Sequence, residues 1–342
     1  MSKRDVAFEM HIPRKGPASV LVPREVTLAP PGPGEVRVAI EATGVAYADI
    51  VMRRGLYPVK LPVTPGYDFV GRVEALGADV EGFSVGQRVA ALTVTGSYAT
   101  RRNVEARWLV PAPEHADAGK LVAAILNGLT AWQMFHRIAR PESGEWVLVH
   151  GAAGGVGSFL LDLAKLANVN AIGTASAGKR EVVESRGAVH LDYATEDIAV
   201  RAALLSEGGV VAAFDHLGGK HLAKQSVAAL RPAGVAVMYG AYDATKNGKV
   251  NPLAIGDLLF NGKFSAYKLF QKSQGVVGYT VTDWRTERLD SYRKDLSHVL
   301  DLVAKGALSP LVGSTYPLKD AAKAQQELES RAVSGKIVLV TA

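Results

Sequence analysis

The sequence predicts an α/β protein in which a compact, β-rich domain precedes a doubly wound parallel sheet. From about residue 147 onward, short apolar runs alternate with helical patterns, which is the order that builds a parallel sheet. Before about residue 111, short strand patterns are interrupted by Pro and Gly, as at residues 29–34 and 62–66. A length of 342 residues is enough for about two such domains.

The parallel sheet is expected to contain six strands, each a short apolar or β-branched run followed by a helix or a turn. The expected strands are residues 147–149, 171–174, 190–193, 210–214, 235–239 and 275–281. The expected helices are residues 158–167, 179–185, 196–206, 221–230, 289–304 and 317–330, before a last strand at 336–340.

A glycine-rich turn joins the first of these strands to its helix. It reads Ala152-x-Gly154-x-x-Gly157, with an apolar run before it and a helical pattern from Ser158 onward. Ala152 is expected to make the tight turn, Gly154 to let the backbone approach a pyrophosphate, and Gly157 to let the helix pack closely on the sheet. The helix N-terminus adds free N–H groups and a positive dipole. The pattern therefore predicts a dinucleotide-binding site.

The second strand indicates which dinucleotide is bound. An NAD site has an acidic residue about 20 residues beyond the fingerprint, bonded to the ribose hydroxyls. Here no acid occurs from Gly173 to Arg180, and Thr174, Ser176, Lys179 and Arg180 stand in its place. Hydroxyls and cations suit a 2′-phosphate, so the sequence predicts NADPH. The alternative is that the two cations belong to the solvated face of a helix.

Composition limits the protein class. The chain is 48% hydrophobic and 21% charged, as a globular protein is, and its net charge of +6 suits an anionic ligand. A nucleic-acid partner is not expected, because no run of Lys and Arg occurs outside residues 243–273. The absence of Cys excludes disulfides and thiolate zinc sites. No signal peptide is visible, and the apolar stretch at residues 121–135 is too short to cross a bilayer. We therefore expect a cytoplasmic protein without a membrane span.

The chain resembles a known family. One segment is similar to the signature of the zinc-independent quinone oxidoreductase (zeta-crystallin-like) family of medium-chain dehydrogenases/reductases. This segment begins with Gly144-Glu145, continues into residues 152–157 and then reaches Lys165. Asp162 departs from this signature, which has Gln there. The long insert at residues 243–273 is similar to that of the vesicle amine transport protein branch.

The resemblance implies a GroES-like catalytic domain at residues 1–123 and 285–342, with a Rossmann domain at 124–284. It also implies a homodimer or tetramer joined through the Rossmann domain. The activity implied is NADPH-dependent hydride transfer to quinones or related conjugated carbonyls. Two alternatives remain open: an enone or alkenal double-bond reductase, and a non-enzymatic NADPH-sensing module that binds RNA or a protein.

No metal site is expected. Zinc alcohol dehydrogenases of the superfamily hold zinc through Cys and then His-Glu, and Ala46 and Tyr67 here cannot do so. His216 and His221 are the one loosely spaced His pair, and they flank a Gly-Gly turn as a strand end and a helix start. Catalysis is therefore expected to be independent of zinc.

The resemblance also implies site residues. Gly154, Gly155, Val156 and Gly157 would contact the pyrophosphate of the cofactor. Ser176, Lys179 and Tyr193, near Thr174, would contact its 2′-phosphate, and Thr130, Tyr239 and Gly240 would contact its nicotinamide. Arg331 would reach the cofactor from the C-terminal segment. Tyr193 has an alternative as a core aromatic, and Arg331 as a surface cap of the last helix.

Tyrosines are the candidates for orienting the acceptor in place of zinc. Tyr47, Tyr57 and Tyr67 lie where the zinc ligands were lost, with Thr130 as a fourth catalytic candidate. A phenol can stack on a flat quinone and donate a hydrogen bond to its oxygen. The alternative is that Tyr47 and Tyr67 only pack the domain core. The insert is expected to bury its four aromatic residues, over the substrate or at a subunit interface.

Overall fold

The computed structural model describes residues 6–242, 244, 251–330 and 333–341. The chain divides into two compact units, Met1–Leu129 with Thr282–Ala342 and Thr130–Val281. These limits differ by a few residues from those expected. Helix α2 (Ala118–Trp132) continues through residue 123 without a break, so the chain offers no natural boundary at that position.

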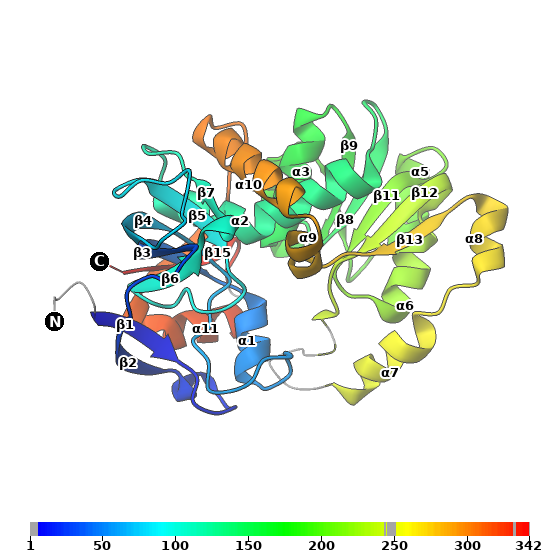
Figure 1. The fold of residues 1–342 in the computed structure, drawn as a ribbon. Helices are drawn as coiled ribbons and strands as arrows, with labels where there is room; N and C mark the ends of the chain where they lie inside the picture. Colours follow the sequence, from blue (N-terminus) through cyan, green and yellow to red (C-terminus); the bar gives the residue numbers. More distant parts are fainter. Residues whose placement is uncertain (1–5, 243, 245–250, 331–332, 342) are drawn as a thin grey trace. The chain divides into compact units, whose positions relative to one another are not determined.

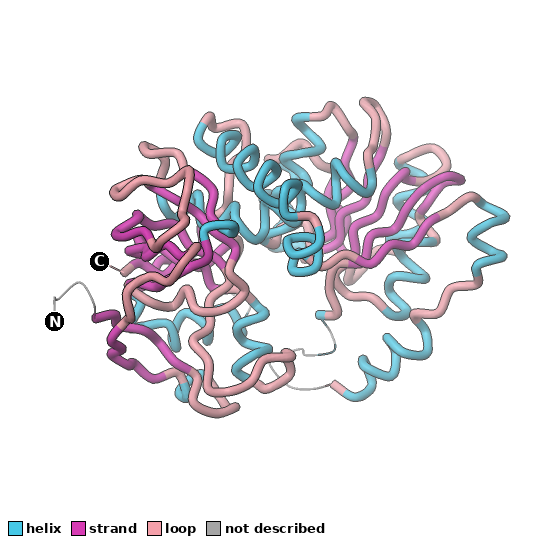
Figure 2. The backbone as a smooth tube through the Cα atoms, in the orientation of Figure 1, coloured by secondary structure: helices cyan, strands magenta, loops and turns pink. Residues whose placement is uncertain are grey.

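The second unit contains a six-stranded sheet in which every neighbouring pair is parallel. Figure 2 shows these strands as one sheet accompanied by helices. The order reverses between β8 and β11, as in the doubly wound fold that the sequence predicts. From one edge to the other the strands are β10 (Val189–Asp192), β9 (Asn170–Ala175), β8 (Trp146–His150), β11 (Val210–Asp215), β12 (Leu230–Met238) and β13 (Gly275–Gly278).

Helices connect these strands. The core contains buried apolar side chains such as Leu148, Ile172 and Leu222. The helix expected at 221–230 is mostly one π-helical segment, and β12 begins at Leu230, earlier than the apolar run indicates. The helical segments are η4 (Gln133–Ala139), α3 (Gly155–Leu166), η5 (Ala177–Lys179), α4 (Arg180–Glu184), α5 (Ile198–Leu205), α6 (Gly219–His221) and η6 (Leu222–Val227).

The first unit is built from both ends of the chain. Strand β15 (Lys336–Val340) pairs antiparallel with β3 (Glu35–Val45), and β14 (Val312–Pro317) runs parallel beside β15. In Figure 1 the red C-terminal strand lies among the blue and cyan N-terminal ones. The other strands are β1 (Val6–His11), β2 (Val22–Thr27), β4 (Asp68–Leu76), β5 (Arg88–Leu92), β6 (Arg101–Glu105) and β7 (Leu109–Pro111). The helices are η2 (Ala18–Val20), α1 (Tyr47–Arg53), η3 (Ala106–Trp108), α9 (Val281–Glu287), α10 (Leu289–Ala304), η8 (Leu318–Asp320) and α11 (Ala321–Ser330).

The described part of the insert contains two helices, α7 (Pro252–Asn261) and α8 (Ala266–Lys272). Phe260, Tyr267 and Phe270 are 71%, 66% and 77% exposed, so the single chain does not bury them, and their expected burial at a subunit interface stays a prediction. Phe264 alone of the four packs against the core of the parallel-sheet unit. The expectation relied on residue type, whereas these aromatics lie on short helices at the edge of the unit.

Candidate functional site

The turn between β8 and α3 requires glycine at two positions. Gly151 has a φ of +66°, so it supplies the left-handed residue of the turn that the sequence assigned to Ala152. A Cβ on Gly157 would lie 2.4 Å from the carbonyl oxygen of Gly151 and 2.7 Å from Cα of Ala152. Helix α3 therefore starts in direct contact with the turn. No side chain caps its N-terminus at Gly154, which leaves the first N–H groups available to an anion.

Thr174 contacts this turn through its side-chain hydroxyl. It is buried near the end of β9, and its Oγ1 lies 3.4 Å from both the Gly151 nitrogen and Nδ1 of His150. The sequence placed Thr174 with the residues around a phosphate. The structure places it under the glycine turn instead, with its hydroxyl next to the Gly151 nitrogen.

Ser176, Lys179 and Tyr193 lie just beyond the ends of β9 and β10. The pairing of Asp192 with Ala175 brings these two strand ends side by side. Tyr193 is 59% exposed, which rules out its alternative role as a core aromatic. Within the described residues, Lys179 has no carboxylate at ion-pair distance, whereas its neighbour Arg180 pairs with Glu184 at 3.0 Å. The half-buried Lys179 is thus the cation at this edge that is available to pair with an anionic ligand.

A polar cluster that sequence reasoning missed occupies the point where the strand order reverses. His150 ends β8 and Asp215 ends β11, and both are buried. Asp215 Oδ1 accepts hydrogen bonds from the Leu217 and Gly218 nitrogens, at 2.7 and 2.8 Å. Its Oδ2 accepts from Nδ1 of His221 at 2.7 Å and from Oγ of Ser226 at 2.5 Å, and these three residues and His150 form one connected group.

The two buried titratable members of this group differ in charge at neutral pH. Burial would raise the pKa of Asp215, but the hydrogen bond from His221, the nearby His150 and the hydroxyl of Ser226 hold that pKa well below its usual value. Burial, reinforced by nearby His221, lowers the pKa of His150 to about 3. At neutral pH the cluster therefore contains an ionised carboxylate beside a neutral imidazole.

Tyr239 and Gly240 follow β12 and border the same region. The Tyr239 nitrogen donates to the carbonyl oxygen of Asp215 at 2.9 Å, and burial raises the pKa of the Tyr239 phenol. A Cβ on Gly240 would lie 2.8 Å from the carbonyl oxygen of His216. Thr130 is buried on α2, and Arg331 lies outside the described residues.

In the first unit, two of the three candidate tyrosines meet. The hydroxyls of Tyr57 and Tyr67 are hydrogen bonded, and their rings are perpendicular, with centroids 6.2 Å apart. Tyr67 is buried, and that burial, with the bond to Tyr57, raises the pKa of its phenol. Tyr57 is half-buried and Tyr47, at the start of α1, is half-buried as well.

Asp49 is a second residue that sequence reasoning missed. Its carboxylate is fully buried and accepts hydrogen bonds from the nitrogens of Ala46 and Gly66, each at 2.9 Å, and from the Tyr98 hydroxyl at 3.2 Å. Burial raises the pKa of Asp49 to about 6. It thus connects the segments of Ala46 and Tyr67, the two positions where zinc ligands were lost.

Asp68, the neighbour of Tyr67, serves structure instead of metal binding. It forms a buried ion pair with Lys336 at 3.0 Å and accepts from the Gly44 nitrogen at 2.9 Å. A Cβ on Gly44 would collide with both side chains. The Asp68 carboxylate therefore links β3, β4 and β15.

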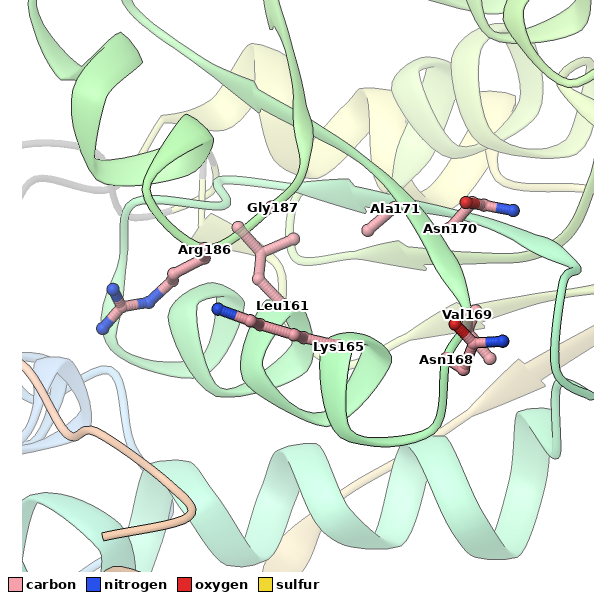
Figure 3. A pocket seen from close by; sticks show the side chains of 8 residues that line it. All are labelled: Leu161, Lys165, Asn168, Val169, Asn170, Ala171, Arg186 and Gly187. Atoms are coloured by element: carbon pink, nitrogen blue, oxygen red, sulfur yellow. The ribbon is translucent and has the colours of Figure 1, made fainter.

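A pocket of the parallel-sheet unit lies at the C-terminal end of α3 (Figure 3). Its lining includes Lys165 at the end of α3, Asn170 at the start of β9, and Arg186, which pairs with Asp162 at 3.3 Å. The fingerprint turn is at the opposite ends of β8 and α3, so this pocket is not the predicted dinucleotide site.

Comparisons with known proteins identify the family. The model of the alcohol dehydrogenase GroES-like domain matches residues 32–114, and that of the zinc-binding dehydrogenases matches residues 186–339. A quinone oxidoreductase of Pseudomonas aeruginosa is 32% identical over 329 residues, covering 95% of this chain and 97% of that one. The chain belongs to the quinone oxidoreductase family of medium-chain dehydrogenases/reductases. Its fold and its class, an oxidoreductase, agree with the sequence-based prediction.

Two further relatives show the breadth of this family. The synaptic vesicle membrane protein VAT-1 homolog of the rat is 33% identical over 316 residues, 91% of this chain and 78% of that one. The quinone oxidoreductase of Escherichia coli, solved as a complex with NADPH, superposes with a TM-score of 0.85 at 28% identity, covering 97% and 99% of the two chains. Among the described residues of the present chain, no helix has the length and apolar character needed to cross a membrane.

Proposed function

We propose that this oxidoreductase uses NADPH, acts without zinc, and transfers hydride to quinones or related conjugated carbonyls. The observation that carries the cofactor assignment is the combination of the glycine turn with the segment from Gly173 to Arg180, which contains Lys179 and no acid. NADPH supplies the hydride when it is bound. The NADPH complex of the related Escherichia coli enzyme supports this choice.

The residues of the turn fit the pyrophosphate of such a cofactor. The backbone of Gly154, Gly155 and Val156 would donate hydrogen bonds at the start of α3, where the helix dipole favours an anion. Gly157 keeps the helix close enough for that geometry. Ser176, Lys179 and Tyr193 would bind the 2′-phosphate, and Tyr239 and Gly240 would border the nicotinamide.

The proposed acceptor contacts come from the tyrosines of the first unit. One hydroxyl of the Tyr57–Tyr67 pair donates to the other, which leaves one proton of the pair for an acceptor oxygen. Tyr47 and Thr130 complete the candidate set. Zinc is not required in this scheme, since Ala46 and Tyr67 offer no ligand that zinc would take and Asp49 is engaged by backbone N–H groups.

An enone reductase is the second candidate. A 2-haloacrylate reductase of a Burkholderia species is 32% identical over 340 residues, covering 96% of this chain and 97% of that one. Such a substrate needs a proton on carbon after hydride transfer, so a positioned acid would matter more than for a quinone.

Turnover of an acceptor panel distinguishes the two candidates. NADPH oxidation is measured against ortho- and para-quinones, enones, aldehydes and a 2-haloacrylate, with NADH as the matched cofactor control. We expect the highest kcat/KM for a quinone with NADPH. A preference for the enones would select the second candidate, and no turnover of any acceptor would contradict the proposal.

We also propose a homodimer joined through the parallel-sheet unit. Strand β13 is the last strand of its sheet, and the insert next to it exposes Phe260, Tyr267 and Phe270. A subunit contact there would cover both the strand edge and the aromatic residues. A cytoplasmic location stays a prediction.

A further inference from the structure

The cluster at the strand-order reversal has the composition of a metal site. His150, Asp215 and His221 each offer one ligand atom, and these three atoms lie within 4.8 Å of one another. Two of the residues end neighbouring parallel strands, β8 and β11, and the third belongs to α6. Rigid strands thus fix two of the three ligands.

One buried nitrogen in the cluster lacks a hydrogen-bond partner among the described residues. Nδ1 of His150 lies 3.4 Å from the hydroxyl of Thr174, but Nε2 of the same ring has no partner in the described part of the chain, although the residue is 1% exposed. A buried polar atom left without a partner costs roughly 1–3 kcal/mol. The cluster next to this atom contains a carboxylate and a second imidazole, and its rings meet edge to face with centroids 4.4 Å apart. An ion would satisfy the unpaired nitrogen.

We propose that His150, Asp215 and His221 bind a divalent transition-metal ion of the Zn²⁺ class, through residues other than those at the lost zinc positions of the family. Two imidazoles and one carboxylate are ligands that such ions accept, and a fourth position remains for water.

Binding requires a small rearrangement. Nδ1 of His221 and Oδ2 of Asp215 are 2.7 Å apart, and two ligands of a tetrahedral zinc ion are about 3.3 Å apart, since each bond is about 2.0 Å. The pair must therefore open by about half an ångström. The Nδ1 proton moves through solvent to Nε2 of the same imidazole, whose side chain is 26% exposed, and Ser226 continues to donate to Asp215. No oxidant or reductant takes part.

Titration of the metal-free full chain with Co²⁺ and with Zn²⁺ tests the site. We expect the visible absorption of four-coordinate Co²⁺, one Zn²⁺ per chain by calorimetry, and a higher Tm of the wild-type chain with Zn²⁺. His221→Gln and His150→Gln should each weaken binding by at least about tenfold. The matched control is His190→Gln, which removes a buried His outside the cluster and should bind Zn²⁺ as the wild type does.

Two results would overturn the proposal. One is the absence of both the Co²⁺ absorption and the Zn²⁺-dependent rise in Tm of the wild-type chain, a measurement that needs no variant. The other is equal Zn²⁺ affinity in the wild type and in folded His221→Gln, which would assign the binding to other histidines. In either case the cluster only supports the turn at residues 215–221.

Discussion

Lys179 tests the cofactor assignment at the scale of a residue. It is the cation at the edge of β9 that has no ion-pair partner among the described residues. Lys179→Ala should weaken NADPH binding by about 1–3 kcal/mol, the scale of a charge-assisted hydrogen bond, and leave NADH binding nearly unchanged. Fluorescence titration measures both. Arg180→Ala is the matched control, since Arg180 already pairs with Glu184. Equal losses for both cofactors would contradict the phosphate contact.

The tyrosines test the acceptor site. Quinone reduction gives a stabilised anion that water can protonate, so the Phe variants of Tyr47, Tyr57 and Tyr67 should each lower quinone turnover less than about tenfold, mainly through KM. An enone should lose much more if its proton comes from that residue. Steady-state kinetics on one quinone and one enone separates these cases, with Tyr267→Phe on α8 as the control. Wild-type behaviour of all three on both substrates would remove the tyrosines from the site.

The burial of Asp49 makes the free energy of unfolding depend on pH. Burial raises its pKa in the folded chain from 3.8 to about 6, so between these values the folded state binds more protons than the unfolded state. Its contribution to the free energy of unfolding therefore falls as pH rises, by up to about 3 kcal/mol between about pH 4 and pH 7. Urea unfolding of the wild type and Asp49→Asn at several pH values measures the difference. Parallel pH curves for the two chains would show that Asp49 does not titrate in this range.

At the scale of an element, the close contact between α3 and the turn after β8 restricts which residue can occupy position 157. Gly157→Ala places a Cβ 2.4 Å from a backbone oxygen, so the helix must shift. We expect a loss of about 1–3 kcal/mol in stability together with weaker NADPH binding, because the shift moves the N–H groups of the first turn. Thermal unfolding and cofactor titration check this. Gly178→Ala is the control, since a Cβ at that position would have no neighbour within 4 Å; an unchanged Gly157→Ala chain would refute the packing argument.

The elements also show what the sequence can predict. The strand runs of the parallel sheet and the helix at 289–304 are confirmed, because their apolar periodicity is local. Helices α7 and α8 were missed although Asn251 and Ser265 cap them and Pro252 follows the first cap. The contacts of Asp49 and of Asp215 could not be predicted, since they depend on which turns the fold brings together.

At the scale of the whole molecule, chelation tests the absence of a catalytic metal. Ala46 and Tyr67 cannot ligate zinc, and Asp68 is paired with Lys336. Exhaustive treatment with a chelator should therefore leave NADPH-dependent turnover unchanged, even if it removes an ion from the cluster at His150. The enzyme is assayed before and after chelation, and again after zinc is restored. A loss of turnover that zinc reverses would contradict a zinc-independent reaction.

The return of the C-terminal strand has a consequence for the synthesis of the protein. The parallel-sheet unit, Thr130–Val281, is continuous in sequence and can fold on the ribosome as soon as it has emerged. The first unit cannot be completed then, because β3 lacks its neighbour β15 and the buried carboxylate of Asp68 lacks Lys336. The N-terminal part of this unit must wait until β15 has been translated, so the unit that is begun first finishes folding after the parallel-sheet unit.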